Sequence, residues 1–141
     1  MKRIAAVALV LLSSVTYAQD DLSLFDGKGR ASAYITDDLT VYLWSGEPVA
    51  YLERDRGREF HVHGFNGKHL GWFVGGVVRD HEGNAACATR EAISNPQPEP
   101  LKSLKSLKPL KSLKELAPLR PLFSLQWGEL PCRFFLKQGE S

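Results

Sequence analysis

The 141-residue sequence has few cysteines and no recognisable catalytic motif. With only two cysteines, it can form neither a zinc ribbon nor a dense disulfide framework. It also has no His-Glu-x-x-His motif, no Gly-x-Ser-x-Gly motif and no complete phosphate-binding loop. Since nothing indicates a convergent catalytic site, we expect a protein that is not an enzyme and needs no cofactor.

Long hydrophobic runs are missing after the first residues. Ile4–Val15 is apolar apart from two serines, follows a short cationic start and precedes a small-residue site that ends at Ala18. This pattern is typical of a secretory signal peptide and is too short for a transmembrane helix. We therefore expect cleavage near Ala18 and a mature protein that is periplasmic or secreted.

No net charge remains once that segment is removed, which argues against nucleic acid as a partner. The charge is unevenly distributed, because residues 19–95 hold 8 basic and 12 acidic residues while residues 96–141 hold 8 basic and 4 acidic residues. Three prolines at alternate positions mark the boundary. The sequence thus divides into a signal peptide at 1–18, a compact module at 19–95, a linker at 96–100 and a tail at 101–141.

The module contains short stretches in which side chains alternate with a period of two. Residues 39–44, 49–52 and 60–63 show this alternation with β-branched and aromatic residues, which is typical of strands. A frame of glycine, three residues, a small residue and usually an aromatic recurs four times. The frame glycines are Gly29, Gly46, Gly67 and Gly83, and the repeat aromatics are Tyr34, Trp44, Tyr51, Phe65 and Trp72.

We interpret each frame glycine as the tip of a β-hairpin, where a positive φ favours glycine. The small residue lets neighbouring backbones approach, and the aromatic fills the gap between repeats. A single hairpin is marginal in water, so each must pack on the next. Four hairpins at near-equal spacing predict radial closure, with a single meander sheet as the alternative.

Two repeats carry the most specific segments, Tyr42–Leu52 and Phe65–Phe73, followed by Asp80–Gly83. With the Leu-Lys-Pro-rich tail that ends in Ser124–Trp127, they resemble the bacterial 4-fold beta flower proteins over roughly residues 22–90. The resemblance implies an all-β fold of four hairpins about a pseudo-fourfold axis, with an extended, largely irregular tail. It implies no established activity and no catalytic residues. The charged insertion Arg54–Glu59 departs from the family pattern, and we expect an exposed loop there.

The tail has nine leucines at a strict spacing of three residues, and a lysine follows each of the first five. This period matches the turn of a polyproline II helix, so the leucines form one face and the lysines a second. The leucines are Leu101, Leu104, Leu107, Leu110, Leu113, Leu116, Leu119, Leu122 and Leu125. We expect this contact face either to pack on the module or on itself, so that the lysines are only a solvated face, or to dock to an envelope protein or an anionic membrane surface.

Two further residue pairs are candidates for local chemistry. Cys87 and Cys132 could form a disulfide in an oxidising compartment, although Cys87 also fits a small buried residue. His61 and His63 lie on one face of a strand and could share a zinc or copper ion, but half-exposed strand histidines explain them better, because no further ligand motif accompanies them.

The sequence as a whole favours an exported, non-enzymatic scaffold or interaction module. We expect a monomer or a weak oligomer. The alternative is a small metal-binding or hydrolytic protein that uses His61 and His63.

Overall fold

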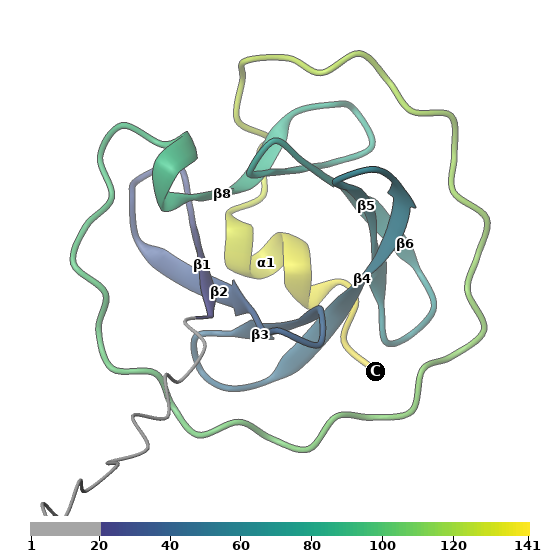
Figure 1. Cartoon of the computed structure of the whole chain (residues 1–141), viewed down its shortest axis with the longest axis horizontal. Helices are drawn as coiled ribbons and strands as arrows, with labels where there is room; N and C mark the ends of the chain where they lie inside the picture. Colours follow the sequence, from purple (N-terminus) through teal and green to yellow (C-terminus); the bar gives the residue numbers. More distant parts are fainter. Residues whose placement is uncertain (1–20) are drawn as a thin grey trace, which may run out of the picture.

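The protein is a closed barrel of antiparallel strands with a short helix at its centre and the tail running around its outside (Figure 1). The computed structural model describes residues 21–141, so the predicted signal peptide at 1–18 lies outside the described residues. The strands are β1 (Leu22–Phe25), β2 (Ala31–Ile35), β3 (Thr40–Leu43), β4 (Pro48–Arg56), β5 (Glu59–Gly64), β6 (His69–Val74), β7 (Val77–Arg79) and β8 (Ala85–Thr89). Each strand pairs with its neighbours in sequence, and β1 pairs with β8 to close the barrel.

Four equivalent hairpins build this barrel, so the predicted all-β fold with radial closure is confirmed. Each tip contains one of the frame glycines, with φ values of 78°, 95°, 91° and 84° in chain order. Each hairpin ladder also has one register shift on the strand that leads into or out of its tip. Such bulges increase local twist, which lets a short hairpin curve into a barrel wall.

Aspartates at two tips hold their turns in shape. One carboxylate oxygen of Asp26 accepts the backbone N–H groups of Lys28 and Arg30. Asp80 does the same for Glu82 and Asn84. This matches the preference of aspartate for bonding turn amides two residues on.

The core lies inside the barrel and includes helix α1 (Cys132–Lys137) from the end of the chain. Phe135 and Leu136 of α1 are buried among apolar side chains from the strands. A disulfide between Cys87 of β8 and Cys132 fixes the start of the helix to the barrel wall. The sequence predicts a largely irregular tail, and this helix, which completes the core, was not expected. A short 3₁₀ turn, η1 (Arg90–Ala92), leads out of β8.

The charged insertion Arg54–Glu59 is not a loop, so that expectation was wrong. Strand β4 continues to Arg56 and β5 begins at Glu59, with the ladder extending from Arg54 opposite Phe60 to Arg56 opposite Glu59. The insertion lengthens this strand pair, and its residues 54–58 are exposed, as expected. No helix among residues 21–141 is long and apolar enough to cross a membrane.

Candidate functional site

The strap, residues 95–125, circles the barrel and meets every hairpin tip in the same way (Figure 1). At each tip a strap N–H donates to the carbonyl of the frame glycine. The four bonds run from Gln97 to Gly29, Ser106 to Gly46, Glu115 to Gly67 and Ser124 to Gly83, at 2.8, 2.9, 2.9 and 3.0 Å. The donors are nine residues apart, so three Leu-x-x triplets span each quarter of the barrel.

The frame glycines are also required by this close approach. A Cβ at any tip would overlap a strap carbonyl oxygen, those of Asn95, Leu104, Leu113 and Leu122 in turn. These residues are again nine apart. Each tip therefore needs glycine both for its positive φ and for the passage of the strap. Sequence reasoning found the first reason only.

The prolines of the strap follow the same period. Pro100, Pro109 and Pro118 are nine residues apart and fall at positions whose backbone nitrogen makes no hydrogen bond to the barrel. Proline has no N–H to leave unpaired there, and its fixed φ favours the extended conformation. The strap is thus a nonapeptide repeat matched to the fourfold barrel.

The basic side chains of the strap point toward the barrel. Lys102, Lys105 and Lys111 lie over tyrosine rings, with Lys111 Nζ 4.1 Å from the ring centre of Tyr51. The basic side chains of the strap also form four ion pairs. They join Lys102 to Asp21, Lys108 to Asp38, Lys114 to Glu53 and Arg120 to Glu59.

Three of these ion pairs lower the pKa of the carboxylate that they contact, namely those at Asp38, Glu53 and Glu59. The hydrogen bond from Lys108 and a second from the Thr36 hydroxyl hold the pKa of Asp38 far below its usual range. Lys114 lowers the pKa of Glu53 in the same way. The lysines remain exposed to solvent but contact the barrel, so the hypothesis that they are only a solvated face is wrong.

The nine leucines form the opposite face of the strap and point away from the barrel. Their exposed fractions lie between 93% and 100%. The hypothesis that this contact face packs on the module is therefore wrong, because the strap uses its lysines and its backbone instead. We call these nine side chains the leucine belt. They are the largest set of fully exposed apolar side chains among residues 21–141.

All four histidines of the sequence meet in one cluster between β5, β6 and the last hairpin tip. His69 Nε2 lies 3.0 Å from His61 Nδ1, and His69 Nδ1 lies 3.0 Å from His81 Nε2. His63 packs edge-on against His69, with 5.2 Å between ring centres. The sequence placed His61 and His63 together, but only the barrel closure adds the other two.

Burial governs the protonation of this cluster. His69 is 2% exposed, and desolvation followed by repulsion from its three histidine neighbours lowers its pKa to about 3. His63 is also buried and its pKa is lowered, chiefly by desolvation, while Glu53 opposes the shift. The Nδ1 atom of His63 is buried without a hydrogen-bond partner. These two rings are therefore neutral at neutral pH.

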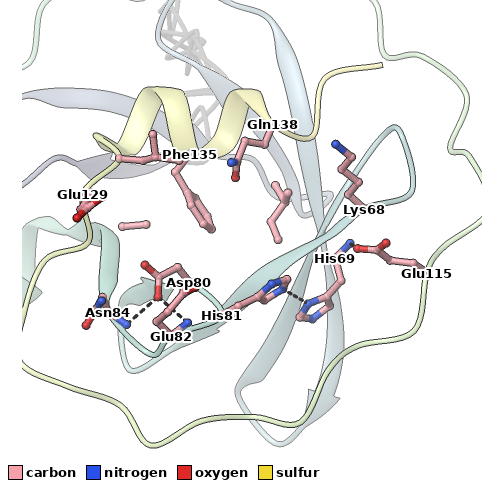
Figure 2. Close-up of a pocket in the computed structure, with 13 residues that line it drawn as sticks. Lys68, His69, Asp80, His81, Glu82, Asn84, Glu115, Glu129, Phe135 and Gln138 are labelled. Carbon is pink, nitrogen blue, oxygen red and sulfur yellow. Dashed lines mark hydrogen bonds between the residues drawn. The ribbon is translucent and has the colours of Figure 1, made fainter.

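A pocket of about 780 Å³ opens beside the cluster, between the last two hairpin tips, α1 and the strap (Figure 2). His69 and His81 line one side of it, and Phe135 projects from α1 on the opposite side. Glu115 reaches in from the strap, where its carboxylate accepts the backbone N–H of His69 at 2.7 Å. The strap therefore contacts the histidine cluster directly.

The candidate metal ligands do not assemble into a complete metal site. Within residues 21–141, no three His, Cys, Asp or Glu side chains converge in a geometry that could hold a metal ion. Each close histidine pair instead has the 3.0 Å separation of a hydrogen bond.

The repeat aromatics lie between successive hairpins. Tyr34 stacks on Tyr42 and meets Trp44 edge-on, and Tyr51 packs on Phe65. The half-buried Trp44 also donates its indole N–H to the carbonyl of Pro100. These rings pack neighbouring hairpins together, and the tyrosines also contact the lysines of the strap.

Four hairpins closed into one barrel and bound by a period-nine strap define a pseudo-fourfold β-repeat protein. The sequence profile of the 4-fold beta flower protein family matches residues 22–136, and the chain belongs to that family. The match extends well past the hairpins and takes in the strap and most of α1. No curated protein and no solved structure matches the chain.

Proposed function

We propose that the protein is a non-enzymatic interaction module of the cell envelope that docks a partner protein through the leucine belt. One observation carries this proposal. Nine leucines stand almost fully exposed on a backbone that the barrel holds in fixed register. A folded domain rarely leaves so many large apolar side chains in one row exposed without a binding role.

The rigidity of the strap supports binding rather than accidental exposure. Backbone hydrogen bonds at every tip fix the strap before any partner arrives, which reduces the entropy lost on association. Leucines three residues apart on a polyproline II backbone are separated by about 9 Å. We infer that the partner has apolar pockets at this spacing, as in grooves that bind polyproline II segments.

Charge and curvature favour a protein groove over an anionic membrane. The lysines are turned inward onto tyrosines and carboxylates, so little basic charge accompanies the leucines. The strap also curves around a barrel (Figure 1). A flat bilayer would touch only one sector of such a convex belt, whereas a concave protein surface can follow several triplets.

The test compares the mature protein with a variant in which Leu107, Leu110, Leu116 and Leu119 become serine. The control variant, Leu22→Ser with Phe134→Ser, removes exposed apolar side chains outside the belt. Each protein is presented to solubilised envelope proteins, and any captured protein is purified and titrated against all three.

Saturable binding to one purified envelope protein that the belt variant loses and the control retains supports the proposal. Binding that survives the belt substitutions contradicts it. Flotation with phosphatidylcholine or phosphatidylglycerol vesicles, or belt-dependent self-association in sedimentation, would overturn it in favour of lipid or of a second copy.

A further inference from the structure

The histidine cluster is exposed to solvent at His81, and at His61 it lies beside the carboxylate of Asp55. His69 is neutral and uses both ring nitrogens, so it donates one hydrogen bond and accepts the other. The chain from His61 through His69 to His81 must therefore run in a single direction. Asp55, whose carboxylate lies 3.6 Å from His61 Nε2, accepts only, and it favours the direction that leaves the exposed His81 with a free acceptor nitrogen.

This arrangement accommodates little positive charge. One added proton fits at the exposed His81 ring or, after transfer along the chain, at His61 beside Asp55. A further proton must enter a buried group of rings whose centres lie 5.1 to 5.9 Å apart. Charges at such separations repel strongly when water is excluded.

The charged groups around the cluster come from four elements. Glu53 and Asp55 lie on β4, and Lys114 and Glu115 lie on the strap. Lys68 from the third tip, and Asp80 and Glu82 from the fourth, line the adjoining pocket. The two strap residues, Lys114 and Glu115, are held by Glu53 and by the backbone N–H of His69, both of which belong to or lie beside the histidine cluster.

Glu53 is shared between the cluster and the strap. One of its oxygens lies 4.0 Å from His63 Nε2, and the other pairs with Lys114. A protonated His63 would compete with Lys114 for this carboxylate, and its positive charge would also repel the Lys114 ammonium group. The neighbouring bond from the backbone N–H of His69 to Glu115 holds the same part of the strap. Charging the cluster therefore acts directly on one quarter of the strap.

We propose that the four histidines form an acid-sensitive latch that releases the third quarter of the strap, residues 110–118, when they gain protons. The other quarters have no histidine beneath them, because all four histidines of the chain lie in this cluster. Release is local, and it changes the presentation of three belt leucines, Leu110, Leu113 and Leu116. The latch does not depend on what the leucine belt binds.

The direction of the pH effect follows from burial. The pKa of His69 is about 3 in the closed state against 6.5 for a free imidazole, so the opened strap binds more protons at acid pH. The closed state is fully favoured above 6.5 and loses stability as the pH falls toward 3. If opening frees His69 completely, protection of the latched amide falls about 20-fold between neutral pH and about pH 5.

Amide hydrogen exchange, corrected for the intrinsic pH dependence of exchange, measures this release. The reporter is the N–H of Glu115, which bonds to Gly67, and the internal control is the equivalent N–H of Ser106, which bonds to Gly46. We expect protection of Glu115 to fall about 20-fold on acidification while that of Ser106 changes less than about twofold. Equal loss at both amides, or no loss at Glu115, would overturn the proposal.

Two variants identify the sensor. Glu115→Gln keeps the acceptor oxygen for His69 but cannot titrate, so acid release should persist in it. If release disappears in Glu115→Gln, protonation of Glu115 is the cause and the latch is refuted. His63→Gln should reduce the pH dependence at Glu115, with protection of Ser106 at neutral pH showing that the variant is folded. An undiminished response in folded His63→Gln would refute the role of the shared Glu53.

Discussion

The backbone N–H of Glu115 donates a 2.9 Å hydrogen bond to the carbonyl of Gly67, although 48 positions separate them in the sequence. The same bond occurs at the other three tips, each with a strap residue nine positions away from the last. The strap is therefore part of the fold. Its register on the barrel decides which of its side chains face inward.

Substitution of a tip glycine should cost more than strain at a positive φ alone. Gly67→Ala forces a Cβ onto the carbonyl of Leu113, whereas Gly57, at φ 55°, has nothing within 4 Å of its own Cβ position. We expect Gly57→Ala to lower the free energy of unfolding by about 1 kcal/mol. Gly67→Ala should lower it by about 1–3 kcal/mol more, because the strap must move.

Urea unfolding of the two variants measures this difference. Equal losses of unfolding free energy in Gly67→Ala and Gly57→Ala would show that the strap does not pass over the tip.

The disulfide should contribute strongly to stability because it ties α1 into the core. Cys87 and Cys132 are 45 residues apart, and closing a loop of that size in the unfolded chain is worth about 4 kcal/mol in the chain-entropy model. We expect a Cys87→Ala, Cys132→Ala variant to lose stability of this order. The wild type should respond to a reducing agent in urea unfolding, whereas the variant should not. A wild type that is indifferent to reduction would refute the bond.

The Lys108–Asp38 pair predicts a titration that depends on the strap. Since Lys108 holds the pKa of Asp38 below its ordinary 3.8, the folded state takes up a proton later than the unfolded chain as the pH falls. The stabilisation is present above 3.8 and is lost in more acid solution. Its size is small, because the pair is largely solvated.

Carboxyl NMR titration tests the pair directly. Lys108→Met should raise the pKa of Asp38 toward its ordinary value. The matched control is Lys105→Met, which removes a lysine that lies over tyrosine rings, and it should leave Asp38 where it is. The same Asp38 titration in wild type and Lys108→Met would show that the strap lysine does not reach the barrel.

Most of the fold could be predicted from the sequence, because it depends on local patterns. Alternation, tip glycines and repeat spacing are properties of neighbouring residues, so the four hairpins and their closure could be predicted. The nine-residue period of the strap is also visible in the sequence, in Pro100, Pro109 and Pro118, but its match to the four tips can be seen only once the barrel is formed.

The orientation of the strap could not be predicted from the sequence, because the hydrophobicity of leucine favours burial of the leucine face. Burying leucines would have satisfied the hydrophobic effect locally. The tyrosine rings and carboxylates on the outside of the barrel instead contact the lysines, and that complementarity exists only after closure. The joining of His61 with His69 and His81 has the same origin, because it spans three separate segments.

The central claim is that the strap turns its leucines outward, and methyl NMR with a soluble paramagnetic agent tests it most directly. We expect strong relaxation enhancement at all nine belt leucines, Leu101 to Leu125, because their exposed fractions lie between 93% and 100%. The methyls of the buried Leu24, Leu43 and Leu136 should be protected in the same sample. Protection of the belt leucines to the level of these three would contradict the account, since the strap would then face the barrel with its apolar side.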